Sequence, residues 1–265
     1  MTTLRLAWSL TALAALIASG AAAAAQCTAE SGARRVPLLE LYTSEGCDSC
    51  PPADRWVSGL PGRGLSAERV VTLAFHVDYW NTLGWADPFA KAEYSARQRA
   101  ASLRNRARFV YTPQLLLNGN DYRLGTFRDD FADRVQAINQ DKAKARISIR
   151  LMPEATHMLF AGGAAMVPDA TERRGAQAYL ALYENRLANQ VTAGENRGKR
   201  LQHDFVVREL AGPFGFDPQG AVQLSHGFQI GRAWKRNDLH VAAFVQNDVT
   251  GEVLQALVLG PCSQP

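Results

Sequence analysis

Residues 41–54 read LYTSEGCDSCPPAD and decide how the first half of the chain folds. Cys47 and Cys50 are separated by two residues, and Pro51 and Pro52 follow the second cysteine at once. Proline is tolerated in the first turn of a helix, where its missing N–H is not needed, but not deeper inside. We therefore expect a helix that begins near Cys50. The cysteine pair itself has three candidate uses: a redox dithiol, part of a metal site or a structural disulfide.

Hydrophobic patterns around this stretch alternate between strand and helix. Apolar runs rich in β-branched and aromatic residues predict strands, whereas apolar residues three or four apart predict helices. Asn118 and Gly119 are typical of a two-residue hairpin turn. The expected order is β-α-β-α-β-β-α, which suggests a small α/β domain with a mixed sheet over residues 26–144. In chain order, the expected elements are a strand at 36–44, a helix at 53–60, a strand at 70–80, a helix at 91–109, a strand at 109–120, a short strand at 121–127 and a helix at 128–142.

The texture of the sequence changes near residue 145. RISIRL, residues 146–151, alternates with period two, and loops rich in Gly, Pro, Asn and Asp separate the strand candidates that follow. Seven short strands in about 115 residues are typical of an immunoglobulin-like β-sandwich. We expect this all-β domain to occupy residues 145–265. Its further strands are expected at 157–166, 176–186, 203–210, 221–230, 239–247 and 252–259.

The first 25 residues have the composition of a secretory signal peptide. One positive charge, Arg5, precedes an apolar run, and the small residues Ala23, Ala24 and Ala25 close the segment. The firmly apolar part is short for a membrane-spanning helix, which needs about 20 apolar residues. We therefore expect cleavage after about Ala25 and export to the periplasm or the cell exterior. No later segment has the length and apolar composition of a membrane span, so the chain is not expected to be membrane-embedded.

The charge balance argues against a dedicated nucleic-acid binder. The chain has 29 Lys and Arg residues against 25 Asp and Glu residues, and loss of Arg5 with the signal peptide changes the net charge from +4 to +3. Nucleic acid attracts proteins with a clear basic excess. The other two cysteines, Cys27 and Cys262, lie close to the ends of the expected mature chain. In an oxidising compartment we expect them to form a disulfide that ties the termini together, with two free thiols as the alternative.

At the junction of a strand and a helix, a C-x-x-C pair suits thiol–disulfide exchange. The first cysteine lies at the helix start, where unpaired N–H groups and the helix dipole favour a thiolate. Because the thiolate is the nucleophile, Cys47 is the expected attacking thiol. Cys50, one turn later, is the expected resolving thiol that releases the product. This chemistry needs no bound cofactor.

Three other uses of the cysteine pair stay open. A tetrahedral zinc site usually needs two such pairs or two histidines close in sequence, and the five histidines of this chain are scattered. Cu(I) could be held by the two thiolates and a third donor such as His76, as in a metallochaperone. A permanently oxidised pair would instead belong to a binding protein without redox chemistry.

A second motif, YTPQ, lies at residues 111–114. A proline just before a buried strand, downstream of a C-x-x-C on the first helix, resembles the thioredoxin fold. Together TSEGCDSCPPAD, FHVDYW and YTPQ resemble an exported bacterial thioredoxin-like family of unknown function, whose second, β-rich domain carries a run similar to ENRGKRLQHDFVVREL at residues 195–210. The resemblance implies a thioredoxin fold over residues 36–142. It also implies a cis bond between Thr112 and Pro113, which would form a ledge for the substrate beside the cysteines.

The family of unknown function supplies no activity, so the expected function rests on the cysteine pair. From that pair we expect disulfides of proteins or small thiols as partners, with the β-sandwich as a docking or dimerising module. The sequence departs from ordinary thioredoxins at the site itself. Asp48 and Ser49 stand between the cysteines in place of Gly and Pro, and no Trp directly precedes Cys47. These departures leave the reduction potential and the substrate open.

Four ionisable residues are candidates for tuning the thiol pKa. Glu45 and Asp48 flank Cys47, and negative charges there raise the pKa of a thiol. This favours a reductase or an isomerase over a strong oxidant. His76 and Asp78, two residues apart on an expected strand, share one face of it. They could shuttle a proton to the thiols or only fix the loop that follows.

Two further features are expected to be structural. His203 and Asp204 lack the G-x-S-x-G turn that would accompany a hydrolase nucleophile, so we expect them to make ordinary hydrogen bonds. Five arginines, in the helix expected at 91–109, are expected to form a solvated face rather than a site for an anionic partner. They are Arg97, Arg99, Arg104, Arg106 and Arg108.

Overall fold

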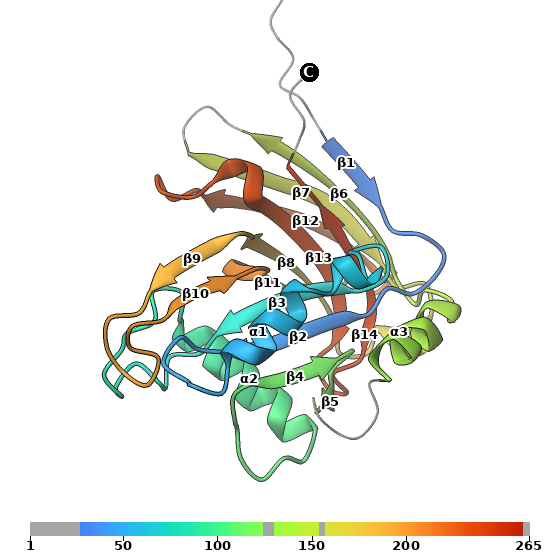
Figure 1. Ribbon diagram of the computed structural model, residues 1–265. Helices are drawn as coiled ribbons and strands as arrows, with labels where there is room; N and C mark the ends of the chain where they lie inside the picture. The colour runs from blue at the N-terminus through green and yellow to red at the C-terminus, as the bar shows by residue number, and fades with distance from the viewer. Residues whose placement is uncertain (1–26, 124–129, 154–156, 262–265) are drawn as a thin grey trace, which may run out of the picture.

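The computed structural model describes residues 27–123, 130–153 and 157–261. These residues form a mixed α/β structure with large sheets and few helices (Figure 1). An eight-stranded sheet runs through the molecule, and a four-stranded sheet packs on part of one of its faces. The strands of the larger sheet, in spatial order, are β14 (Val253–Leu259), β13 (Leu239–Asn247), β8 (Ala176–Glu184), β11 (Val206–Gly215), β3 (Val71–His76), β2 (Leu38–Thr43), β4 (Gln114–Leu117) and β5 (Asn120–Tyr122).

The half of this sheet that contains β3, β2, β4 and β5 has the predicted β-α-β-α-β-β-α order. β2 and β3 are parallel, β4 is antiparallel to β2, and β5 is antiparallel to β4. β4 starts later than expected, directly after Pro113, because proline has no N–H for a strand ladder. The helices of the described residues are α1 (Pro51–Ser58), α2 (Ala92–Arg104), α3 (Phe131–Gln140) and α4 (Ala170–Arg173), with short 3-10 helices η1 (Pro61–Arg63) and η2 (Arg236–Asp238).

Helices cover both faces of this half of the sheet. α2 packs on the face formed by Tyr42 and Phe75, whereas α1 and α3 pack on the face formed by Leu39 and Leu41. Every residue of β2 and β3 is therefore buried. A strand that is buried on both faces has no polar side to alternate with, which explains why the two strands read as nearly continuous apolar runs.

β4 and β5 are joined by the predicted two-residue turn. Asn118 and Gly119 both have positive φ, at 53° and 84°, as the hairpin geometry requires. The turn also packs closely against a loop of the second half of the chain. A Cβ built on Gly119 would lie 2.0 Å from the carbonyl oxygen of Gly251, so only glycine fits there.

We expect Gly119→Ala to destabilise the chain more than Gly64→Ala does. Gly64 has a similar φ of 77°, so alanine at either position is strained by about 1–2 kcal/mol. At Gly64, however, a Cβ would meet nothing within 4 Å among the described residues. Urea unfolding should give the strain alone for Gly64→Ala and a clearly larger loss for Gly119→Ala. Equal losses would show that the turn does not need its contact with Gly251.

The other half of the large sheet comes from the second half of the chain. β11 pairs in parallel with β3 through Val206 and Ala74, and the N–H of Ala74 donates to the carbonyl oxygen of Phe205 at 2.8 Å. β8, β13 and β14 then continue the sheet in antiparallel pairs. β11 thus covers the edge of β3, which would otherwise expose unpaired backbone groups.

A four-stranded sheet packs over β8, β11, β13 and β14, with an apolar core between the two layers. Side chains such as Ile149 and Phe228 from the smaller sheet meet Leu180 and Val241 from the larger one. A separate two-stranded ribbon contacts α1. The smaller sheet contains, in spatial order, β1 (Cys27–Glu30), β6 (Arg146–Pro153), β7 (Met158–Met166) and β12 (Ala221–Gln229), and the ribbon contains β9 (Leu187–Gln190) and β10 (Arg200–His203).

The strands predicted for the second half exist, but their pairing differs from a sandwich that stands alone. Four of them extend the sheet of the first half, while β1 from the first half joins the smaller sheet. Alternation of apolar residues predicts a strand and its buried face, but it does not say which strand lies beside it. The large sheet therefore contains strands from both sides of the boundary expected at residues 144 and 145, and the division into two domains stays a prediction.

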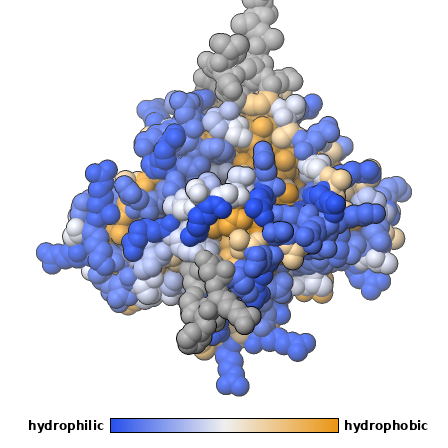
Figure 2. Space-filling model, turned by 45° about the vertical axis from the view of Figure 1, so that its right-hand side comes forward, coloured by the Kyte–Doolittle hydropathy of each residue, from blue (hydrophilic) through white to orange (hydrophobic). Residues whose placement is uncertain are grey.

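Hydrophilic residues cover most of the face seen in Figure 2, with hydrophobic patches in its upper and central parts and at its left side. Among the described residues, no helix has both the length and the apolar composition to cross a membrane. The expected signal peptide, residues 1–25, lies outside the described residues, and so does Cys262. Cys27 begins β1, and its predicted disulfide with Cys262 stays a prediction.

Candidate functional site

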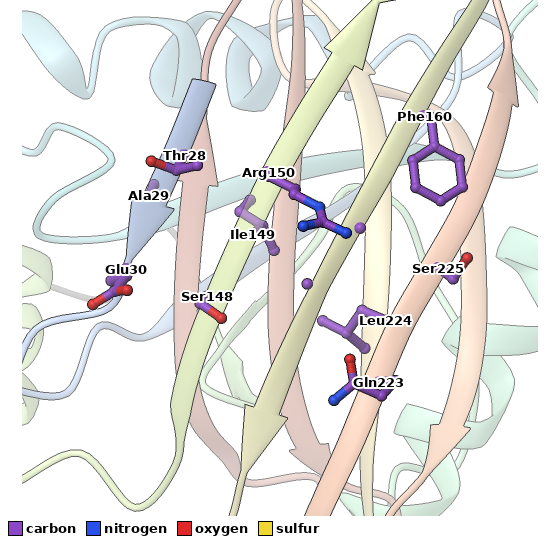
Figure 3. A pocket seen from close by; sticks show the side chains of 12 residues that line it. Thr28, Ala29, Glu30, Ser148, Ile149, Arg150, Phe160, Gln223, Leu224 and Ser225 are labelled. Carbon is purple, nitrogen blue, oxygen red and sulfur yellow. The ribbon is translucent and has the colours of Figure 1, made fainter. Parts of the chain in front are cut away.

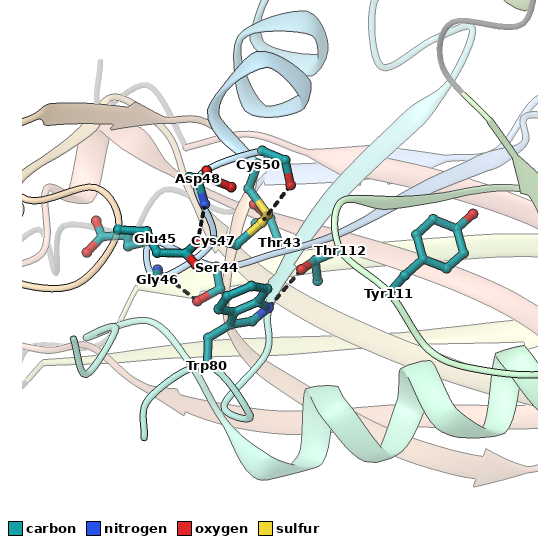
Figure 4. Close-up of a disulfide and its surroundings, with 12 residues drawn as sticks. Thr43, Ser44, Glu45, Gly46, Cys47, Asp48, Cys50, Trp80, Tyr111 and Thr112 are labelled. Carbon is teal, nitrogen blue, oxygen red and sulfur yellow. Dashed lines mark hydrogen bonds between the residues drawn. A yellow bond between two sulfur atoms is a disulfide. The ribbon is translucent and has the colours of Figure 1, made fainter. Parts of the chain in front are cut away.

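The cysteine pair lies in the loop between β2 and α1, and its sulfurs form a disulfide (Figure 4). The Cα atoms of Cys47 and Cys50 are 5.5 Å apart, and both residues are 0% exposed. Cys50 is the N-cap of α1, with Pro51 and Pro52 as the first two helical residues. The predicted start of this helix is therefore confirmed. A reactant can reach the sulfurs only if the groups that cover them move.

The start of α1 offers the cysteines fewer N–H groups than the sequence suggested. The first two helical residues are prolines without N–H, and the next two N–H groups both donate to the carbonyl oxygen of Cys50, at 2.9 and 3.1 Å. The expectation that unpaired N–H groups at the helix start would favour a thiolate is therefore wrong for the first turn of α1. A polar partner of Cys47 is instead the hydroxyl of Ser49, with 3.3 Å between Sγ and Oγ. After reduction, this hydroxyl can donate a hydrogen bond to the thiolate.

A segment from the second half of the chain holds the cysteine loop in place. The side-chain amide of Asn196 donates to the carbonyl oxygens of Glu45 and Cys47, at 2.9 and 2.8 Å. The backbone N–H of Asp48 donates to the carboxylate of Glu195 at 3.1 Å. Asn196 is 0% exposed, so its amide satisfies two carbonyls that water does not reach. The loop conformation thus depends on residues about 150 positions away.

Glu45 is the centre of a buried polar network beside the cysteine loop. One carboxylate oxygen accepts hydrogen bonds from Trp85 Nε1 and Asn189 Nδ2, both at 2.9 Å. The other oxygen lies 3.1 Å from Nε2 of His203, and the backbone N–H donates to Asp87 at 2.8 Å. Glu45 is 0% exposed, so these partners take the place of the water that a carboxylate otherwise needs.

Two histidines meet next to this network. His76 ends β3 and His203 ends β10, and their ring centroids are 5.0 Å apart. Nδ1 of His76 lies 2.6 Å from the carboxylate of Asp87, and Nδ1 of His203 lies 3.5 Å from Oδ1 of Asp54. Burial alone would lower the pKa of His203, but the nearby carboxylates of Asp54 and Glu45 raise that pKa to about 10. His203 therefore does more than make the ordinary hydrogen bonds expected from the sequence, because it lies between two buried carboxylates.

The second motif also lies near the disulfide. The peptide bond between Thr112 and Pro113 is cis, as predicted. Trp80 contacts both motifs. Its indole N–H donates to Oγ1 of Thr112 at 2.8 Å. On the other side, the Cβ of Trp80 packs so closely on the cysteine loop that a Cβ built on Gly46 would lie only 3.0 Å from it. Figure 4 shows the indole between Thr112 and the cysteine loop, with the ring of Tyr111 pointing away.

Hollows lie beside the cis-proline and on the smaller sheet. One of about 320 Å³, beside the cis-proline, is lined by Phe109, Tyr111, Pro113, Leu115, Tyr122 and Arg123. A second hollow, of about 450 Å³, lies on the four-stranded sheet (Figure 3) and is lined by residues of β1, β6, β7 and β12 such as Glu30, Arg150 and Ser225. None of the predicted site residues lines this second hollow. Pro113 lines the first hollow, whereas Asp48 lines a third, of about 530 Å³, together with Pro51 and Pro52.

Asp78 does not join the other predicted site residues. β3 ends at His76, so the expectation that the two residues share one face of a strand is wrong. The backbone N–H of Asp78 donates to Oγ of Ser95 at 3.0 Å, and the Ser95 hydroxyl donates back to the carboxylate. Asp78 thus fixes the start of α2. A role of Glu45, Asp48 or His76 in tuning the thiol pKa stays a prediction.

The profile of one protein family, described as "Protein of unknown function (DUF1223)", matches residues 38–246. The chain belongs to this family. The matched range includes the cysteine loop, the cis-proline motif and the 195–210 run, whereas Cys27 and Cys262 lie outside it. None of the curated proteins compared with the chain is significantly similar to it.

Two solved structures are similar to this chain. The X-ray crystal structure of protein AGR_C_4864 from Agrobacterium tumefaciens is 24% identical, with a TM-score of 0.60, and the match covers 87% of this chain and 97% of that one. HBP35 of Porphyromonas gingivalis is 15% identical, with a TM-score of 0.67, and the match covers 86% of this chain and 76% of that one. At these identities the likeness concerns the fold alone.

Several residues of the site were not predicted from the sequence, among them Asp54, Asp87, Asn196 and His203. The two from the second half lie within ENRGKRLQHDFVVREL, the run singled out by resemblance at residues 195–210. The resemblance of residues 195–210 to the family's second domain was therefore the signal that could have identified Asn196 and His203. The first part of this run, ENRGKR at residues 195–200, is strongly polar and precedes an expected strand, which is a reason to examine it as part of the site.

Proposed function

We propose that this protein carries out thiol–disulfide exchange through Cys47 and Cys50, and is thus a candidate thiol–disulfide oxidoreductase. The observation that carries the proposal is the position of Trp80. This side chain contacts both the loop of the disulfide at the start of α1 and the cis-bonded Thr112 and Pro113. A thioredoxin-like unit over residues 36–142 is supported by the parallel pairing of β2 with β3 and the antiparallel pairing of β4 and β5.

The disulfide state would accept two electrons from a dithiol substrate. A substrate thiolate attacks Sγ of Cys47, a mixed disulfide forms, and Cys50 leaves as a thiolate. The second substrate thiol, once deprotonated, then attacks the substrate sulfur that is bonded to Cys47. The substrate becomes a disulfide, and Cys47 leaves as a thiolate. The reverse sequence reduces a substrate disulfide. The Ser49 hydroxyl can stabilise the Cys47 thiolate in either direction.

The surroundings of the pair indicate how a substrate would approach. Because both cysteines are buried, exchange requires their surroundings to move. Trp80 and the segment around Asn196 contact the cysteine loop, and we expect one of them to be displaced. The hollow beside Pro113 is lined mainly by apolar and aromatic side chains, and Phe109 at its rim is 67% exposed. We expect it to receive an apolar side chain of a protein substrate, while the backbone of Thr112 pairs with the substrate backbone. The negative charges of Glu45 and Asp48 disfavour a thiolate at Cys47, which favours a reductase or an isomerase over a strong oxidant. We propose that the chain acts as an exported protein.

Trapping with single-cysteine variants tests the proposal. Cys50→Ala leaves Cys47 as a lone thiol that cannot be resolved, so incubation of the full chain with oxidised glutathione should give one mixed disulfide, seen as one glutathionyl group by mass spectrometry. Cys47→Ala is the matched control, and its Cys50 should react much more slowly. Trapped partners from the exported fraction would then identify substrates.

Burial of the disulfide favours a second function, that of a binding protein with a permanently oxidised pair. This reading predicts no adduct on Cys50→Ala, and alkylation of cells would find Cys47 oxidised under all conditions. A faster reaction at Cys50 than at Cys47 would contradict the proposed order of attack. The Cu(I) alternative has less support, because the ring nitrogens of His76 face Asp87, Asp54 and His203.

A further inference from the structure

Three buried side chains converge beside the cysteine loop from different elements. Asp54 comes from the first turn of α1, His76 from the end of β3 and His203 from the end of β10. One donor atom from each lies within 4.8 Å of the others, and all three side chains are at least nine-tenths buried. Such convergence of two imidazoles and a carboxylate is the donor set of many metal sites.

The outer atom of each side chain already has a partner. Asp87 lies against Nδ1 of His76, and Glu45 lies against Nε2 of His203. An ionised carboxylate only accepts hydrogen bonds, so these two nitrogens carry a hydrogen, and in a neutral, metal-bound imidazole the opposite nitrogen of each ring supplies the lone pair. Oδ2 of Asp54 accepts a hydrogen bond from the Thr43 hydroxyl at 3.0 Å. Metal-bound histidines almost always have such an outer carboxylate or carbonyl partner.

The inner nitrogens have no such partner. Nε2 of His76 and Nδ1 of His203 are buried without a hydrogen bond among the described residues. A buried polar atom without a partner is rare in native proteins and calls for an explanation. Oδ1 of Asp54 lies 3.5 Å from the His203 nitrogen, close to the about 3.3 Å that separates two ligands on one tetrahedral Zn²⁺ with bonds near 2.0–2.1 Å.

The charges around these atoms also favour a cation. Glu45, Asp54 and Asp87 are three buried carboxylates, and their ion-pair partners among the described residues are the two histidines alone. A divalent ion bound between them would offset two of these three negative charges.

We propose that Asp54, His76 and His203 bind one divalent transition-metal ion, Zn²⁺ by their donor set, with a fourth position left to water or a ligand. Cys47 and Cys50 are not ligands, so the site is distinct from the proposed redox pair and its existence does not depend on the proposed function. Asp87 and Glu45 orient the two imidazoles. The ion would join β3 and β10 to α1, and thus connect the two halves of the chain behind the cysteine loop.

Metal titration of the full chain, stripped with a chelator and kept oxidised, tests the site. Isothermal titration with Zn²⁺ should give one equivalent, and Co²⁺ should give the visible absorption bands of a tetrahedral ion. His76→Gln and His203→Gln should each weaken binding at least about 100-fold, and Asp87→Asn, which only removes an orienting charge, by about 10–100-fold. His226→Gln is the matched control, because His226 also pairs with a carboxylate, Glu209, at 2.6 Å but lies on β12 of the smaller sheet.

The double variant Cys47→Ser with Cys50→Ser separates this proposal from the redox one. It should lose all thiol exchange and keep the metal with unchanged affinity. Loss of the metal in this variant would overturn the proposal in favour of a thiolate site. Failure of the wild-type chain to bind Zn²⁺ or Co²⁺ would overturn it as well, even if the histidine variants do not fold. Unchanged binding in folded His76→Gln or His203→Gln would do the same.

Discussion

Arg97→Met is expected to lower the free energy of unfolding by about 3–5 kcal/mol, because it leaves a buried carboxylate without its counter-charge. Nε of Arg97, on α2, lies 2.7 Å from Oε1 of Glu40, in the middle of β2, and the two side chains are only 11% and 2% exposed. A second guanidinium nitrogen donates to Gln246 on β13 at 2.9 Å. Burial alone would lower the pKa of Arg97, but the charge of Glu40 raises it. The expected loss is measurable by urea unfolding.

Arg99→Met is the matched control, since Arg99 lies on the same helix but is exposed, and it should change stability by less than about 0.5 kcal/mol. Adding Glu40→Gln to Arg97→Met should recover part of the loss, because the unpaired charge disappears. If Arg97→Met and Arg99→Met lose equally little, then the ion pair does not attach α2 to the sheet.

Arg97 also shows where prediction from the sequence ended. Its helix has arginines on several sides, and this pattern was interpreted as a solvated face. Whether one of them is buried depends on a carboxylate 57 residues away in sequence that itself lies in an apolar strand. A polar residue inside such a strand, as Glu40 is in LLELYT, is the local signal that a buried partner exists. It does not say which of five arginines is the partner.

The features of the cysteine loop likewise fall into those that the sequence predicts and those that it does not. The start of α1, the hairpin turn and the cis-proline were predicted because each depends on two or three neighbouring residues whose geometry is restricted. The clamp by Asn196 and the pairing of His203 with Glu45, 158 residues apart, were not. They follow from the pairing of β11 with β3, which brings the second half of the chain to the cysteine loop. Strand patterns predict that β11 exists, but not that it completes the first sheet.

Glu45→Ala is the second substitution with a large expected effect, on stability and on the disulfide together. It leaves Nε2 of the buried His203 without its acceptor, and it removes the acceptor of two half-buried groups, the indole N–H of Trp85 and the amide of Asn189. Unpaired buried groups of this kind are expected to lower the free energy of unfolding by about 3–5 kcal/mol. Because the residue lies two positions before Cys47, its loss should also loosen the loop that covers the disulfide. Reduction by dithiothreitol, followed by thiol alkylation, should be several-fold faster than in wild type.

Glu68→Ala, at an exposed glutamate, is the control for the general effect of removing a negative charge, and it should leave both properties unchanged. Glu45→Gln should fall between, because the amide keeps an acceptor for Trp85 but no charge for His203. Both measurements are made on chelator-treated chain, so that a bound ion does not compensate for the lost carboxylate. Should Glu45→Ala destabilise the chain while the disulfide is reduced at the wild-type rate, the cover over the sulfurs would have to come from Trp80 and Asn196 alone. Burial of the pair would then be controlled by the loop's contacts with these two side chains, rather than by the polar network beside it.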